Sequence, residues 1–183
     1  HFALTARLWP LISKTEGSRV VQVASLAHRF GKIRKDDINW EKGYKKWGAY
    51  GMSKLANLLF IHELAARVSA EKKKILVAAA HPGYANTELQ AKGSKMKGSR
   101  LGADAFSLAN QLVGQPASRG ALPSLYAATA ADVEQGAYYG PGGILKLHGW
   151  PQVDSPDPKL VTDELSEELW DMSEALTGVK FTV

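Results

Sequence analysis

A tyrosine and a lysine four residues apart, Tyr50 and Lys54, are the residues of this sequence best suited to chemistry. Positions i and i+4 of a helix lie on one face, about one turn apart. A phenol titrates near ~10 and is a poor base at neutral pH, but a nearby cation favours its phenolate form. A phenol tuned in this way can exchange a proton with a carbonyl or alcohol oxygen. We expect the helix to begin at Tyr50, so that its N-terminus adds positive potential.

Taken alone, the pair is equally typical of an exposed tyrosine that packs on a lysine stem. Features on both sides of it favour the chemical interpretation. Ser25 ends an apolar segment before the pair, and Pro82-Gly83 ends another after it, with Thr87 shortly beyond. A hydroxyl and a tight turn would therefore meet the same cleft as the phenol.

The segments that must position these residues are predicted as strand, helix and strand. Residues 19–25 are rich in valine, residues 50–69 carry an apolar stripe at helical spacing, and residues 75–80 form a second short apolar run. This order is a βαβ unit with parallel strands, in which ligands bind at the carboxyl ends of the strands. The predicted fold is α/β, a doubly wound Rossmann-like parallel sheet, with residues 1–183 in one domain.

Local signals predict the remaining elements. In chain order these are a helix over 1–14, a polar connection over 26–49, a helix over 117–131, a turn-rich loop over 136–143, a short strand over 144–147 and a helix over 162–176. Thr162 or Asp163 caps the last helix, and Gly178 lies just beyond its end. Residues 90–115 mix glycine and lysine with an amphipathic stretch, and they are predicted to form a substrate lid.

Three stretches carry a resemblance to a known family. They are V-A-S-L-A-H at 23–28, Y-G-M-S-K-L-A-N at 50–57 and H-P-G-Y-A-N-T-E-L at 81–89. Together they resemble the short-chain dehydrogenase/reductase family, and the long spacing between the first two resembles its retinol-dehydrogenase-like branch. The resemblance covers residues 1 to about 145 and implies the C-terminal half of the family's Rossmann fold. It implies an oxidoreductase that transfers a hydride between a nicotinamide cofactor and a carbonyl or alcohol.

The resemblance also implies a role for each residue of the site. Tyr50 is the general acid/base, Lys54 favours its phenolate and holds the nicotinamide ribose hydroxyls, and Ser25 hydrogen-bonds the substrate oxygen. The carboxamide end of the cofactor is held by the segment after the second strand, at Pro82, Gly83, Ala85 and Thr87. The branch favours NADP over NAD as the cofactor.

The family's glycine-rich phosphate loop is expected in an N-terminal half that would precede residue 1. Residues 136–142 match G-x-x-x-G-x-G, but no strand is predicted before them and no helix after them, so an ordinary turn is expected there. A non-catalytic Rossmann-like scaffold or half-domain therefore remains the alternative function.

The composition of the chain favours some classes of binding partner over others. The net charge of +5 would suit nucleic acid or an anionic membrane, but the lysines fall in short scattered groups such as Lys45-Lys46 and 72–74, for which a solvated surface is expected. There is no cysteine, no histidine spacing typical of a metal site and no apolar run long enough to span a membrane. We therefore expect a cytoplasmic protein without a metal and without nucleic acid as partner. The sequence leaves a homo-oligomer open.

The expected substrate is a small apolar carbonyl or alcohol, because the lid supplies Leu101, Phe106, Leu108 and Leu112. Retinoid, steroid and lipid aldehydes are the branch-level candidates. The sequence also allows predictions for residues outside this group. We expect His28 and His81 either to contact substrate or to have a structural role. We expect packing roles for Tyr84, Trp40, Trp47 and Trp150, and a solvated position for Asp154.

Overall fold

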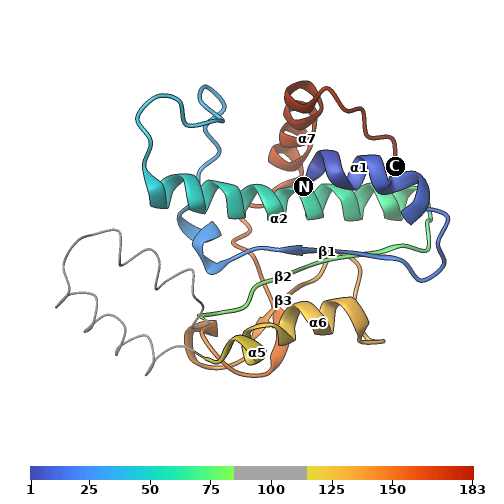
Figure 1. The fold of residues 1–183 in the computed structure, drawn as a ribbon, viewed down its shortest axis with the longest axis vertical. Helices are drawn as coiled ribbons and strands as arrows, with labels where there is room; N and C mark the ends of the chain where they lie inside the picture. The colour runs from blue at the N-terminus through green and yellow to red at the C-terminus, as the bar shows by residue number, and fades with distance from the viewer. Residues whose placement is uncertain (85–114) are drawn as a thin grey trace.

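The computed structural model describes residues 1–84 and 115–183, and in it a four-stranded sheet lies between two layers of helices (Figure 1). The strands, in the order in which they pair, are β1 Arg19–Val23, β2 Leu76–Ala80, β3 Tyr138–Pro141 and β4 Pro151–Asp154. The first three are parallel, with Arg19 opposite Leu76 and Ala79 opposite Tyr138, and β4 is antiparallel to β3. The predicted α/β fold with a Rossmann-like parallel sheet is confirmed, with one antiparallel strand added at the edge.

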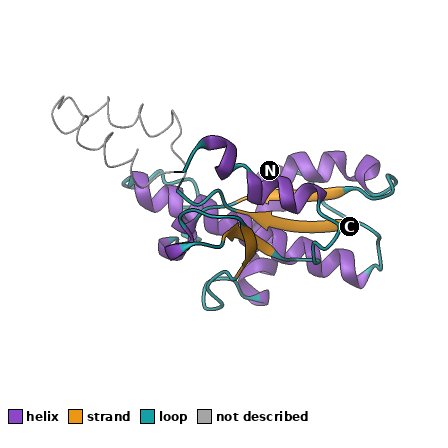
Figure 2. Cartoon of the chain, turned by 90° about the horizontal axis from the view of Figure 1, so that it is seen from below, coloured by secondary structure: helices purple, strands orange, loops and turns teal. Residues whose placement is uncertain are grey.

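The helices cover both faces of the sheet, as the second view also shows (Figure 2). One face carries α1 Phe2–Ile12, α2 Lys46–Ala70 and α7 Asp163–Thr177, and the other carries α5 Ala117–Gly120 and α6 Leu122–Thr129. Two 3₁₀ turns, η1 Leu26–Phe30 and η2 Ile144–Lys146, follow β1 and β3. Both 3₁₀ turns therefore follow the carboxyl ends of parallel strands.

The central strand β2 shows why its sequence is continuously apolar. Val77 and Ala79 belong to the buried cluster under α2, whereas Ala78 and Ala80 belong to the buried cluster under α6. Successive side chains of a strand point to opposite faces, and both faces of this strand are covered. The apolar run at 75–80 therefore identified the centre of the sheet.

Helix α2 begins four residues earlier than predicted. Its first residue is Lys46, and Lys45 at the N-cap makes no side-chain capping hydrogen bond, so no cap residue marked the boundary. Tyr50 therefore lies beyond the first turn, where the helix dipole has largely faded. The expected contribution of the helix N-terminus to the potential at Tyr50 is accordingly small.

The C-terminal third contains the largest differences from the sequence predictions. The expected loop at 136–143 contains β3, and the expected strand at 144–147 is η2, in which Leu145 and Lys146 have positive φ values of 54° and 59°. The single helix expected over 117–131 is divided into α5 and α6, because Pro123 has no N–H to continue the first helix.

The last helix follows the prediction closely. The Thr162 hydroxyl accepts a hydrogen bond from the Leu165 N–H at 3.2 Å, and Gly178 ends the helix in the left-handed conformation with φ 65°. Both are the expected signals for a helix start and stop.

Candidate functional site

Tyr50 and Lys54 lie together on α2, at the carboxyl end of β1. The Lys54 Nζ atom is 5.7 Å from the centre of the Tyr50 ring, and it donates a hydrogen bond to the Val23 carbonyl oxygen at 3.3 Å. Asn57, one turn further along, donates to the same oxygen at 3.0 Å. The Tyr50 side chain is partly open to solvent, with 37% of its surface exposed. The helix therefore presents an accessible phenol beside a cation that is tied to the end of a strand.

Ser25 lies two residues after the end of β1 and caps η1. Its hydroxyl accepts a hydrogen bond from the Ala27 N–H at 3.2 Å. Glycines allow η1 to lie close to α2: a Cβ on Gly51 would come within 3.0 Å of the Ala27 carbonyl oxygen, and one on Gly31 within 2.4 Å of the Gly51 carbonyl oxygen. The segment after Ser25 is thus packed on the turn of α2 that carries Tyr50. That the Ser25 hydroxyl and the phenol meet one substrate remains a prediction.

His28 supports Ser25 from inside the fold. It is fully buried, and its Nδ1 lies 2.7 Å from the Ser25 carbonyl oxygen, which can only accept, so Nδ1 carries the proton. Burial lowers the pKa of His28, and this effect outweighs the hydrogen bond to Ser25, which acts in the opposite direction. Of the two roles open to His28, the structure favours the structural one.

The turn after β2 is tightly held. Gly83 has a φ of 65°, which favours glycine, and a Cβ there would lie 2.4 Å from the Leu147 carbonyl oxygen. The Gln115 side-chain amide donates to the Pro82 carbonyl oxygen at 2.8 Å, and the Tyr84 N–H donates to the Leu147 carbonyl oxygen at 2.7 Å. Two of the predicted cofactor residues, Pro82 and Gly83, therefore occupy a fixed turn at the carboxyl end of β2.

Part of the predicted site lies outside the described residues. This applies to Ala85 and Thr87, and to the predicted lid at 90–115 apart from Gln115. Their roles stay predictions.

A buried histidine–carboxylate pair, which sequence reasoning missed, supports the turn. His81 is fully buried and its Nε2 donates to an Asp154 carboxylate oxygen at 2.9 Å, while its Nδ1 accepts from the Gly83 N–H at 3.2 Å. These partners select the neutral tautomer protonated at Nε2. Asp154 is only 9% exposed. The prediction of a solvated surface for this residue was therefore wrong.

Asp154 lies beside His81, 73 residues away in the sequence, because β4 pairs with β3 in the antiparallel direction. No short-range sequence signal marks such a pairing. Burial acts to raise the pKa of Asp154, but the hydrogen bonds from His81 and from the Ser155 N–H outweigh it, so the pKa lies below its ordinary value.

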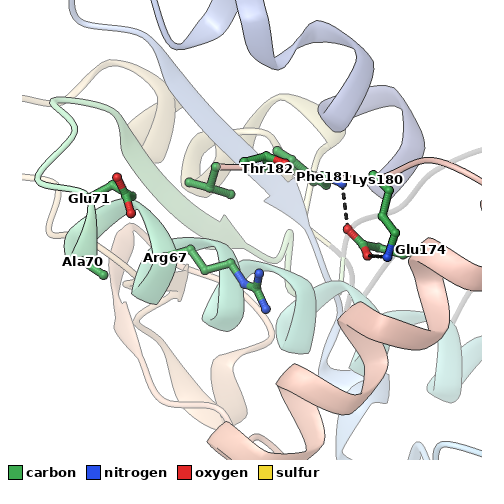
Figure 3. A pocket seen from close by; sticks show the side chains of 8 residues that line it. Arg67, Ala70, Glu71, Glu174, Lys180, Phe181 and Thr182 are labelled. Carbon is green, nitrogen blue, oxygen red and sulfur yellow. Dashed lines mark hydrogen bonds and ion pairs between the residues drawn. The ribbon is translucent and has the colours of Figure 1, made fainter.

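A hollow of about 430 Å³ lies at the opposite end of α2 (Figure 3). It is lined by Arg67, Ala70, Glu71, Glu174, Lys180, Phe181, Thr182 and Val183. Glu174 is already bonded to the Lys180 ammonium at 2.6 Å and to the Phe181 N–H at 2.7 Å, and Arg67 to Glu63 at 2.6 Å. Glu174 thus fastens the C-terminal segment, and the polar groups of this hollow do not form part of the candidate site.

Among residues 1–84 and 115–183, no group of three or more histidine, aspartate or glutamate side chains could hold a metal ion. Within the same ranges, no helix combines the length and the apolar character needed to cross a bilayer.

Comparison with known proteins identifies relatives across nearly the whole chain. The chain is 34% identical over 181 residues to retinol dehydrogenase 14 of Mus musculus, a match that covers 98% of this chain and 50% of that protein. Retinol dehydrogenase 13 of Homo sapiens is 34% identical over 184 residues, covering 98% of this chain and 52% of its own. The chain thus spans about half the length of these relatives. No model of a protein family matches it.

Among solved structures, the chain is similar to an uncharacterized protein from Mycobacterium paratuberculosis. The TM-score is 0.74 at 33% sequence identity, and the match covers 100% of this chain and 57% of the other. The fold of the described residues is therefore shared with a larger protein.

Proposed function

Since the chain belongs to the short-chain dehydrogenase/reductase family and is related to the retinol dehydrogenases, we propose that it forms the catalytic half of an oxidoreductase. The reaction is reversible hydride transfer between NAD or NADP and a carbonyl or alcohol. The observation that carries the proposal is the Tyr50 phenol beside the Lys54 ammonium, at the carboxyl end of β1.

Tyr50 moves the proton in this proposal. During reduction its hydroxyl gives a proton to the substrate carbonyl oxygen, and during oxidation the phenolate takes the proton of the alcohol. Ser25 donates a hydrogen bond to the same substrate oxygen, and Lys54 places a positive charge beside the phenol. When bound, a nicotinamide would supply or accept the hydride.

The donor set of Lys54 fits the cofactor. An ammonium carries three donors, and among the described residues one group, the Val23 carbonyl oxygen, accepts a hydrogen bond from Lys54. The remaining donors suit the ribose hydroxyls beside the nicotinamide. The Pro82–Gly83 turn, with Ala85 and Thr87, would hold the carboxamide end. NADP is favoured over NAD, on the resemblance to the retinol-dehydrogenase-like branch.

An apolar substrate suits the proposal best. The predicted lid offers Leu101, Phe106, Leu108 and Leu112, and retinoid, steroid and lipid aldehydes or alcohols share a long apolar body with one reactive oxygen. The names of the retinol dehydrogenases favour the retinoid class.

The test is turnover by the intact protein, followed by nicotinamide absorbance with NADPH or NADH and a panel of apolar aldehydes and alcohols. We expect turnover of at least one substrate with a preference for apolar ones. Nicotinamide binding without any turnover would instead support the alternative, a non-catalytic Rossmann-like scaffold.

A further inference from the structure

His81 is buried beside the Pro82–Gly83 turn, and its ring can hold the turn in one of its two neutral forms. The Gly83 N–H donates to Nδ1 at 3.2 Å, so Nδ1 is free of a proton and Nε2 carries it. The opposite tautomer would turn an Nδ1–H toward the Gly83 N–H, and two donors would then face each other. The bond from His81 to the turn therefore depends on which ring nitrogen is protonated.

Asp154 selects the tautomer that the turn needs. One carboxylate oxygen accepts from His81 Nε2–H at 2.9 Å, and the other accepts from the Ser155 N–H at 2.9 Å. The pKa of Asp154 lies below its ordinary value in spite of burial, because these hydrogen bonds favour the charged form, so both oxygens are acceptors at neutral pH. Two donors thus converge on one side chain. A carboxylate accepts both, whereas an asparagine would offer one oxygen for two donors.

Strand β3 makes room for the His81 ring. A Cβ on Gly140 would lie 1.8 Å from His81 Nε2, so a side chain at this position would collide with the ring. The Tyr138 ring, two residues earlier on the strand, lies against His81 with a centroid distance of 5.1 Å. Gly140 belongs to the G-x-x-x-G-x-G match at 136–142, and here the glycine allows the close approach of a histidine. The position of the ring is therefore fixed by its surroundings.

Gln115 holds the same turn independently of His81. It was predicted as the last residue of the lid, but it is 4% exposed and is part of the scaffold. Its side-chain amide donates to the Pro82 carbonyl oxygen at 2.8 Å and accepts from the Gly149 N–H at 3.3 Å. Its backbone N–H donates to the Tyr84 carbonyl oxygen at 3.0 Å. Gln115 therefore ties the turn to the glycine-containing loop that follows η2.

We propose that Asp154, acting through His81, and Gln115 are positioning residues that hold the Pro82–Gly83 turn in the shape that binds the nicotinamide end of the cofactor. The inference rests on the proposed function, which assigns this turn to the carboxamide. A turn that is already held in its binding conformation does not have to be ordered when the cofactor arrives, so the entropy cost of ordering it does not lower the affinity. Loss of either positioning residue should therefore weaken cofactor binding.

The test combines the dissociation constant of NADPH, from fluorescence titration, with the tautomer of His81, from ¹⁵N NMR of the histidine rings in the intact protein. Asp154→Asn keeps the size of the side chain but leaves two donors for one oxygen. We expect Kd to rise about tenfold, which corresponds to the loss of about one hydrogen bond to the turn. The spectra should show both tautomers of His81, where the unchanged protein shows the Nε2-protonated form alone. A pair that only stabilised the fold would leave Kd unchanged.

Gln115→Met is the second variant, and its result does not depend on whether Asp154→Asn folds. Methionine keeps the length of the side chain but removes both the donor to Pro82 and the acceptor from Gly149. We expect Kd for NADPH to rise here by about tenfold as well, with the tautomer of His81 unchanged. The two variants thus share the effect on affinity and differ in the spectrum.

Val68→Ala is the control for stability, because it removes fully buried contacts near the far end of α2. It should leave Kd unchanged, and circular dichroism should show which variants are folded. An equal rise of Kd in Val68→Ala would show that weaker binding follows from lost stability and would overturn the proposal. So would an unchanged Kd in Gln115→Met and in folded Asp154→Asn. If the unchanged protein bound neither NADPH nor NADH, the proposed function itself would fail, and this inference with it.

Discussion

The Lys54 ammonium lies 5.7 Å from the centre of the Tyr50 ring on its own helix, and it donates to the Val23 carbonyl oxygen at the end of β1 at 3.3 Å. If the Lys54 side chain only packed on the tyrosine ring, no backbone group would hold its ammonium in place. Here the end of β1 holds the cation, so the charge beside the phenol has a fixed position. Fixed charge beside a proton donor is what acid–base chemistry at a phenol requires.

The first prediction concerns the phenol itself. Tyr50→Phe keeps the ring and its contact with Trp47 but removes the exchangeable proton. We expect kcat of the intact protein to fall by roughly 10²-fold or more, while cofactor binding persists. Tyr126→Phe is the control, because Tyr126 lies on α6, on the other face of the sheet, and its hydroxyl donates to Asp132. This variant should not affect turnover. A Tyr50→Phe protein with unchanged kcat would refute the assignment of Tyr50 as acid/base.

The second prediction concerns Lys54→Arg, which keeps the charge and replaces a compact ammonium by a wide planar fork. The fork cannot donate to Val23 and to ribose hydroxyls in the same geometry, so KM for the cofactor should rise and kcat should fall. Steady-state kinetics at varied NADPH concentration measures both. Lys180→Arg, on an exposed side chain paired with Glu174, is the control and should change neither. If Lys54→Arg left the cofactor KM unchanged, Lys54 would not hold the ribose.

Much of the fold was predictable because its signals are local. The apolar run at 75–80 identified β2, and Thr162 and Gly178 marked the ends of α7. The placement of Tyr50 and Lys54 on one face of a helix follows from the helical repeat alone, and the Lys54 Nζ atom lies 5.7 Å from the centre of the Tyr50 ring. Each of these features depends on residues within a few positions of one another.

The features that sequence reasoning missed depend on distant partners. The sequence around β3 indicates a turn because glycines flank Tyr138 and Tyr139, and pairing with β2 and β4 makes these two residues a strand. Asp154 was assigned to the surface because nothing near it in sequence announces His81. The early start of α2 at Lys46 had no capping side chain to signal it.

The third prediction concerns the stability that Asp154 provides. Asp154→Ala leaves the His81 Nε2–H buried without its acceptor, and an unpaired buried donor costs about 1–3 kcal/mol. Chemical denaturation should show a loss of that size in the free energy of unfolding. Asp171→Ala on the exposed face of α7 is the control, with an expected change within about 0.5 kcal/mol. Equal losses in the two variants would mean that the His81–Asp154 pair contributes nothing specific.

The fourth prediction is a loss of stability in mild acid, caused by His28. Burial lowers the pKa of this histidine below its ordinary value of 6.5, with the nearby charge of Arg29 acting in the same direction and the hydrogen bond to Ser25 and the charge of Asp154 opposing it. Above pH 6.5 the folded and unfolded states are both neutral at His28, and its contribution is fully present. As pH falls through 6.5 the unfolded state binds the proton first, so the free energy of unfolding decreases until the pH passes below the folded pKa.

The variant His28→Asn separates this effect from the rest of the acid response. Its amide can still donate to the Ser25 carbonyl oxygen, but it does not titrate. We expect lower stability at pH 7.5, because the ring is lost from the core, together with a shallower decline between about pH 7 and 5. The pKa of Asp154 also lies below its ordinary value of 3.8, so its own loss of stability falls beneath this window. Urea denaturation across the window measures the slope, with His148→Asn, an exposed histidine, as the control that should keep the slope of the unchanged chain. If His28→Asn declined as steeply as the control, protonation of His28 could not be the cause of the acid sensitivity.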